Sequence, residues 1–159
     1  MRNPIIKGHY ADPDIACFDG KYYIYPTTDG GICWEGPNFQ VFSSSDLVEW
    51  KNEGVALHMA DVAWCGGIHG WAPAIGYRNG KYYFYYSANK NIAVDIGERP
   101  EGPFTDIGRP LVASGAYPCQ AIDPEFLKTM TESSTCTGAT HTYMVYSWPK
   151  IWFILSAIL

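Results

Sequence analysis

One short unit occurs twice in the sequence, as DGKYYIYPTT at 19–28 and as NGKYYFYYSA at 79–88. Each copy begins with a turn dipeptide, Asp-Gly or Asn-Gly, and continues into a run of aromatic and β-branched residues. This combination is the strongest short-range signal for a β-hairpin. The glycines of the two copies, Gly20 and Gly80, lie 60 positions apart (80 − 20). We therefore predict two hairpins that belong to a repeated structural unit.

The remaining pattern between and around these hairpins is also that of short strands. Strand-like runs follow the first copy at 39–45 and 54–57, bounded by Gly, Pro and Asp, and we find no convincing helical periodicity over 11 residues. A single sheet of such strands cannot bury both of its faces, so a repeat of about 60 residues favours a radial β architecture. We predict an all-β protein, a β-propeller, with two blades and the beginning of a third.

Composition narrows the classes of partner. The chain of 159 residues is long enough for one domain with a sizeable core. Asp and Glu outnumber Lys and Arg by 16 to 11, which gives a net charge of −5 and no basic stripe, so phosphate backbones would be repelled. We therefore expect no nucleic-acid partner. Aromatic residues make up 16% of the chain, and their flat rings suit both sheet cores and sugar faces.

Cysteine usage and the apolar segments bear on location. The five cysteines are an odd number without a C-x-x-C pair, so we expect mostly reduced thiols and neither a zinc site nor a complete disulfide framework. The N-terminus lacks the apolar core of a secretory signal, which predicts a cytoplasmic protein or a trimmed start. The apolar run at 151–159 is far shorter than the ~20 residues that span a bilayer. We expect no membrane partner.

Three strings in order carry a family resemblance: GHYADPDIACFDGKYYIYPTT at 8–28, GWAPAI at 70–75 and QAIDPEF at 120–126. Together with the repeat they resemble glycoside hydrolase family 43, over about residues 3–126. The resemblance implies a five-bladed β-propeller, of which this chain holds the first two blades and the start of a third. Residues 1–126 are thus interpreted as the N-terminal portion of a glycosidase propeller.

The resemblance also implies an inverting reaction, in which a general base activates water and a general acid protonates the leaving oxygen. It assigns the base to Asp12, in A-D-P, and the residue that orients the acid and tunes its pKa to Asp123, in I-D-P. Proline restricts the residue before it, so we expect both aspartates in extended conformations that aim their carboxylates. Taken alone, an Asp before Pro is often only a turn former. Asp14, where the family usually has a small residue, is expected on the same strand face as Asp12.

Two tryptophans are candidates for stacking on a sugar. Trp71 lies in the segment that resembles the wall of the family's sugar site, although a core tryptophan packed between blades is an equal alternative. Trp34 is a weaker candidate that rests on its place in the glycine-rich loop GGICWEGPN. His9 and His69 are assigned no role, because a lone histidine is more often structural.

The family's general acid is a Glu in an E-G-P string well beyond I-D-P. Here PEGPF at 100–104 precedes Asp123 and resembles a connecting segment, so Glu101 is rejected and the general acid is absent from this chain. After 126 the composition turns to Ser and Thr and then to apolar residues. Back-translation of Lys128–Trp148 in a shifted frame permits DDDGKFYLYWGNTHIYGVQL, a third copy of the repeat. We interpret 127–159 as an out-of-frame, non-native tail; a divergent natural tail is the alternative.

The resemblance thus implies a truncated α-L-arabinofuranosidase or β-xylosidase, weakly active or inactive as given. Its substrates would be arabinoxylan, arabinan or xylo-oligosaccharides. No cofactor is required, and no metal ligands are assigned, although relatives sometimes hold a structural calcium. A non-catalytic carbohydrate-binding propeller fragment is the alternative, and a non-functional reading frame is the third possibility.

Overall fold

A computed structural model describes residues 4–116, 120–128, 141–147 and 150–155. Within these ranges the regular structure consists of strands and two three-residue 3-10 helices, η1 (Ile32–Trp34) and η2 (Met59–Asp61). None of the helices described there is long and apolar enough to cross a membrane. The prediction of an all-β chain is confirmed. The strands are β1 (Tyr10–Phe18), β2 (Lys21–Thr28), β3 (Asn38–Ser44), β4 (Lys51–His58), β5 (Gly70–Arg78), β6 (Lys81–Ala88), β7 (Asn91–Gly97), β8 (Thr105–Asp106), β9 (Pro124–Lys128), β10 (His141–Ser147) and β11 (Lys150–Leu155).

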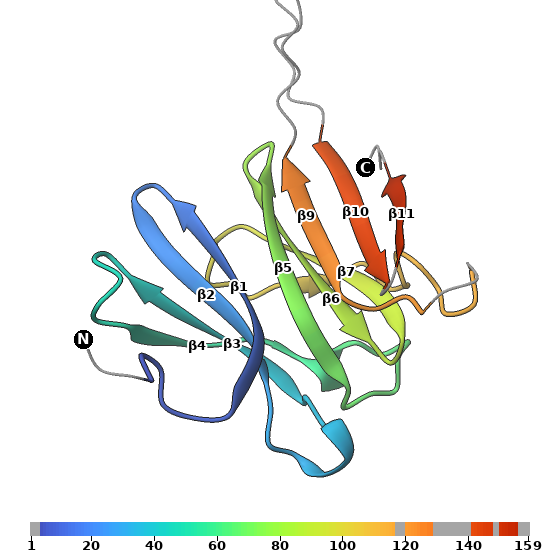
Figure 1. Cartoon of the computed structure of the whole chain (residues 1–159), viewed down its shortest axis with the longest axis horizontal. Coiled ribbons are helices and arrows are strands. Elements are labelled where there is room, and N and C mark those ends of the chain that lie inside the picture. The colour runs from blue at the N-terminus through green and yellow to red at the C-terminus, as the bar shows by residue number, and fades with distance from the viewer. Residues whose placement is uncertain (1–3, 117–119, 129–140, 148–149, 156–159) are drawn as a thin grey trace, which may run out of the picture.

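The strands form three antiparallel sheets in sequence order. The first two are four-stranded, β1-β2-β3-β4 and β5-β6-β7-β8, and the third contains β9, β10 and β11. The first strands of the sheets lie side by side, β1 against β5 and β5 against β9 (Figure 1). This places one inner strand per sheet around a common centre, as in a propeller. The predicted two blades and the start of a third are present.

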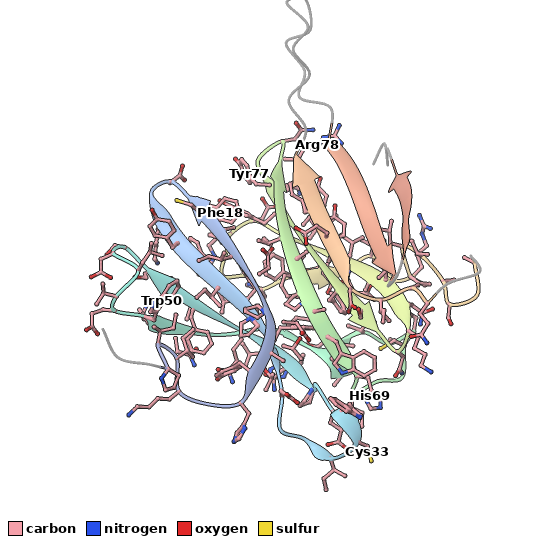
Figure 2. All side chains as sticks on the ribbon, in the orientation of Figure 1. Phe18, Cys33, Trp50, His69, Tyr77 and Arg78 are labelled. Atoms are coloured by element: carbon pink, nitrogen blue, oxygen red, sulfur yellow. The ribbon has the colours of Figure 1, made fainter. Side chains whose placement is uncertain are left out.

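The two repeated units form the predicted hairpins. Asp19 and Gly20 have φ values of 51° and 78°, and Asn79 and Gly80 have 51° and 79°. Two consecutive residues with positive φ in a two-residue loop define a type I′ turn, whose twist matches that of the flanking strands. Both turns lie at the same end of the molecule, where Phe18 and Tyr77 meet with ring centroids 6.2 Å apart (Figure 2).

The main core lies between the first two blades and is largely aromatic. Tyr25, Phe39, Phe84 and Tyr86 are completely buried. The ring of Phe39 packs edge-on against Phe84 at 5.1 Å and lies 5.2 Å from Tyr86. The strand tyrosines and phenylalanines of the repeat therefore join neighbouring sheets, which accounts for much of the aromatic composition.

The C-terminal segment interpreted as out of frame contributes to the third sheet. β10 pairs with β9 on one side and with β11 on the other. The other residues of 127–159, apart from the last two of β9, lie outside the described ranges. The out-of-frame origin is a statement about the gene and stays a prediction.

The thiols agree with the sequence analysis where they are described. Cys17, Cys33 and Cys65 are free. Cys119 and Cys136 lie outside the described residues.

Candidate active site

A proline follows an unusual backbone conformation at the start of each inner strand. Asp12 in β1, Ala72 in β5 and Asp123 just before β9 have φ values of 44°, 43° and 56°, and each precedes a proline. These values lie in the left-handed region, which is costly for residues other than glycine. The expectation that proline holds Asp12 and Asp123 in extended conformations is therefore wrong.

Local irregularity and tertiary contacts override the proline rule at these positions. The register of β1 against β2 shifts between Ala11 and Asp14, and that of β5 against β6 shifts between Trp71 and Ala74. Each shift is a β-bulge that takes up the residue before proline, and bulges re-aim side chains. Strained backbone of this kind gathers at functional sites, so the three positions mark the starts of the inner strands as the site.

Two of these left-handed residues are each held by a buried hydroxyl group from another strand. The amide of Ala72 donates a hydrogen bond to Oγ1 of Thr27 at 2.7 Å, and the amide of Asp123 donates one to Oγ of Ser87 at 2.8 Å. Thr27 and Ser87 lie at the ends of β2 and β6, in the blade that precedes the amide. Both side chains are buried, with exposures of 4% and 0%. Each blade thus fixes the first turn of the next inner strand.

The structure brings Asp12 and Asp123 together although 111 positions (123 − 12) separate them. Neighbouring atoms partly desolvate the carboxyl group of Asp123, although the residue is exposed, and this raises its pKa. The negative charge of Asp12 raises the pKa of Asp123 further. Two carboxyl groups that interact in this way are suited to acid and base chemistry.

Asp14 has a different position from the one expected. Because Asp12 lies in a bulge, the two-residue alternation of a strand does not relate the two aspartates. Oδ2 of Asp14 accepts a hydrogen bond from the amide of Ile75 at 2.8 Å, and Oδ1 accepts one from the amide of Ile15 at 2.7 Å. Burial raises the pKa of Asp14, and these two hydrogen bonds oppose the rise. Asp14 thereby joins β1 to β5 and is a structural residue.

Glu125 is a further acidic residue that sequence reasoning missed. Neighbouring atoms partly desolvate the carboxyl group of Glu125, although the residue is exposed, and this raises its pKa; the negative charge of Asp14 raises it further. Glu125 follows Asp123 by two residues, as Asp14 follows Asp12, so the alignment of the A-D-P-D and I-D-P-E strings could have revealed this second pair.

The two predicted tryptophans meet at one loop. The loop that contains η1 contacts the segment before β5, because the amide of Gly36 bonds to the carbonyl of Ile68 at 2.7 Å. Nε1 of Trp71 donates a hydrogen bond to the carbonyl oxygen of Trp34 at 2.8 Å. Trp71 is half-buried there and is not a core residue between blades, whereas the side chain of Trp34 is 78% exposed.

His69 completes this cluster at the end of the molecule opposite to the hairpin turns. Its ring centroid lies 5.3 Å from that of Trp71, and its Nδ1 lies 3.2 Å from the carbonyl oxygen of Trp34. Figure 2 shows His69 near Cys33, which is part of η1, and far from Phe18 and Tyr77. The loop that contains η1 is therefore on the same side of the molecule as the starts of the inner strands. Of the two tryptophans, Trp34 has the more accessible ring.

Glu101 lies in the connection between β7 and β8, at a contact between blades. Its Oε1 accepts a hydrogen bond from the hydroxyl group of Tyr23 at 3.3 Å and lies 3.9 Å from Nζ of Lys21. These partners give Glu101 a structural role in joining the first two blades. The geometry is that of a connecting segment, as the sequence analysis assigns.

Within the described ranges, no group of three or more His, Cys, Asp or Glu side chains is arranged to share a metal ion. The structural calcium that the resemblance allows remains a prediction.

Neighbouring antiparallel sheets, with Asp12 and Asp123 at the starts of the first and third inner strands, define a β-propeller. The model of the glycosyl hydrolases family 43 matches residues 1–135, and the chain belongs to this family. It is 32% identical over 140 residues to the beta-D-galactofuranosidase xynD of Aspergillus niger and 34% identical over 139 residues to the xylosidase/arabinosidase 43A of Humicola insolens. These alignments cover 79% and 76% of the chain.

Solved structures show the same fold. A GH43_1 enzyme from Xanthomonas citri, complexed with xylotriose, matches 89% of the chain with a TM-score of 0.71 and 30% identity. The chain covers 41% of that structure and 41% of each of the two curated relatives. It therefore spans about two fifths of the length of the proteins it matches.

Proposed function

We propose that this chain is the N-terminal part of an inverting glycoside hydrolase that acts on plant-cell-wall pentosides. Asp12 is the general base and Asp123 orients the general acid and tunes its pKa. The observation that carries this proposal is the pairing of Asp12 and Asp123, which have the same left-handed conformation at the starts of β1 and β9 and interact through their charges. An inverting enzyme needs carboxyl groups on opposite sides of a sugar ring, with room for water between the base and the sugar.

The substrate class rests on the relatives. Three of them are named as a xylosidase/arabinosidase of Humicola insolens, an arabinoxylan arabinofuranohydrolase of Bacillus subtilis and a beta-xylosidase of Xylanibacter ruminicola. Two more, of Aspergillus clavatus and Neosartorya fischeri, are named as probable arabinan endo-1,5-alpha-L-arabinosidases. We therefore take arabinoxylan, arabinan and xylo-oligosaccharides as the proposed substrates. Hydrolysis needs no cofactor in this scheme, because two side-chain carboxyl groups move the protons.

The activity of the 159-residue chain itself is expected to be low. The general acid belongs to the part of such a protein that follows the region matched here, and Glu101 is engaged with Tyr23 and Lys21. General acid catalysis is worth roughly 10²- to 10⁴-fold in rate, so a chain without the acid should lose at least that much.

The test combines a nucleotide sequence with an activity assay. The nucleotide sequence is read from codon 120 to several hundred bases past codon 159, and a frame-restored protein is assayed with aryl β-xylopyranoside and aryl α-L-arabinofuranoside. We expect an open shifted frame that encodes the third repeat and an E-G-P glutamate, together with hydrolysis that the substitution Asp12→Asn abolishes. An unrelated or closed frame, or hydrolysis that survives Asp12→Asn, contradicts the proposal.

A second candidate is a carbohydrate-binding propeller fragment without catalysis. The observation that favours it is the exposure of Trp34 beside the half-buried Trp71, since a free indole face suits stacking on a sugar. Binding of xylotriose by a frame-restored protein that shows no turnover after long incubation would support this function over hydrolysis.

A further inference from the structure

Both blade junctions contain the same contact between a hydroxyl group and a backbone amide. In the first junction the hydroxyl oxygen of Thr27 in β2 accepts a hydrogen bond from the amide of Ala72. In the second, the hydroxyl oxygen of Ser87 in β6 accepts one from the amide of Asp123. The hydroxyl residues lie 60 positions apart (87 − 27), which is the spacing of the sequence repeat. The contact is therefore a property of the repeated unit.

We propose that Ser87 is the positioning residue of Asp123: its hydroxyl group holds the left-handed backbone that directs the Asp123 carboxylate toward Asp12. This role deepens the proposed function and rests on it, because Asp123 matters for hydrolysis only if the chain belongs to a glycosidase.

Ser87 has the rigidity that such a role needs. It lies within β6, opposite Trp71 of β5 on one side and Ile92 of β7 on the other, and it is completely buried. Strand pairing on both sides fixes the backbone of Ser87, and burial restricts its side chain. The amide of Asp123 lies 2.8 Å from this restricted hydroxyl oxygen.

The conformation of Asp123 gives the contact its effect. A φ of 56° is unfavourable for a residue with a Cβ atom, and the following proline disfavours folded backbone as well. A hydrogen bond to the amide of that same residue stabilises this backbone against the extended alternative. In the extended alternative the Asp123 side chain would point in another direction and lose its proximity to Asp12.

The first junction supplies an internal comparison. Thr27 makes the same bond, at 2.7 Å, to Ala72, whose φ is 43°. Ala72 carries no carboxyl group, so the structural part of the contact is present there without the electrostatic part. A substitution at Thr27 therefore reports what loss of the hydroxyl group does to a blade junction alone.

The experiment measures the pKa of Asp123 and the exchange of its amide by NMR in the 159-residue chain, without sugar. Ser87→Ala is compared with Ser87→Thr, which copies the residue of the first blade, and with the matched control Thr27→Ala. We expect Ser87→Ala to move the pKa of Asp123 down toward its ordinary value and to reduce protection of the Asp123 amide by roughly tenfold or more. Ser87→Thr should restore both, and Thr27→Ala should leave the pKa of Asp123 unchanged.

Two results overturn the proposal. One is a pKa of Asp123 that Ser87→Ala leaves in place or that Thr27→Ala moves equally. The other, which needs no variant to fold, is an Asp123 amide in the unsubstituted chain that exchanges at the rate of an unprotected amide while the amides of β6 stay protected. Neither measurement depends on hydrolysis. The positioning role can therefore fail while the glycosidase proposal stands, and the glycosidase proposal can fail while Ser87 is shown to position Asp123.

Discussion

Asp95, in β7, is a completely buried carboxyl group away from the candidate active site. The hydroxyl group of Tyr86 donates a hydrogen bond to its Oδ1 at 3.0 Å, whereas Oδ2 has no hydrogen-bond partner among the described residues. Burial raises the pKa of Asp95 to about 7, the charge of Asp106 adds to the rise, and the bond from Tyr86 opposes it. A buried acid of this kind makes the stability of the blade depend on pH.

We predict that Asp95→Asn removes part of this dependence. Between about pH 4 and pH 7 the folded state binds more protons at Asp95 than the unfolded state, so the free energy of unfolding falls as the pH rises. The full change is at most about 4 kcal/mol, from the shift between 3.8 and about 7. Urea titrations at several pH values should show a shallower fall for Asp95→Asn. An identical slope in both proteins would contradict the prediction.

Substitution of Trp34 tests whether the exposed indole ring binds a sugar. We predict that Trp34→Ala weakens binding of xylotriose by roughly tenfold, because a stacked aromatic ring contributes about 1 kcal/mol or more. Its 78% exposure means that the melting temperature should hardly change. The matched control is Ile32→Ala, on the same loop and 79% exposed. Calorimetric titration in which both variants bind equally well would show that the indole ring is not a binding group.

At the scale of the elements, the third sheet is held against the second by close packing around a glycine. A Cβ atom on Gly76 of β5 would lie 2.6 Å from the ring of Phe126 in β9. Real Cβ contacts are not that short, so the ring of Phe126 occupies the space that a side chain at position 76 would need. β9, which follows Asp123, thus depends on the absence of a side chain in β5.

We predict that Gly76→Ala destabilises the chain by about 1–3 kcal/mol and disturbs the amide signals of β9. The control is Gly80→Ala, where a Cβ would meet nothing within 4 Å but φ is +79°. That variant should cost about 1–2 kcal/mol through the turn alone and leave β9 unchanged. Equal effects of both variants on β9 would mean that Gly76 does not set this contact.

The elements also show what the sequence can predict. The hairpins were predictable because a type I′ turn is encoded by two adjacent residues, such as Asn79 and Gly80. The propeller followed from the repeat. The left-handed φ of Asp123 was not predictable, because the hydroxyl group that holds it comes from Ser87, 36 residues away. For the same reason the bond from Ile75 to Asp14 could not be foreseen, since it joins two strands that meet only in the folded chain.

At the scale of the whole molecule, the described sheets form a sector of a ring. A propeller closes by packing its last blade on its first, so a sector leaves a sheet face open. On β1, Ile15 is 55% exposed and Cys17 is exposed as well. Apolar strand surface of this kind favours association with other chains.

We predict that the isolated 159-residue chain is poorly stable or associates. Sedimentation velocity should show species larger than the monomer whose share grows with concentration, and Ile15→Thr should reduce that share. The control is Val55→Thr in β4, where the residue is 41% exposed. A compact, stable monomer at all concentrations would contradict the prediction.

The contacts at the blade junctions also have an order in time. Thr27 precedes Ala72 and Ser87 precedes Asp123, so each accepting strand leaves the ribosome before the amide it will hold. Each new inner strand can therefore dock on a sheet that is already complete. β1 belongs to the earliest of the described sheets, and in a closed ring its neighbour on the other side is the last blade to be made. We expect Asp12 to become fixed last, and amide exchange at Asp12 in chains of increasing blade number tests this order. Synthesis itself would then leave Asp12, the proposed general base, without its fixed conformation until the ring is closed.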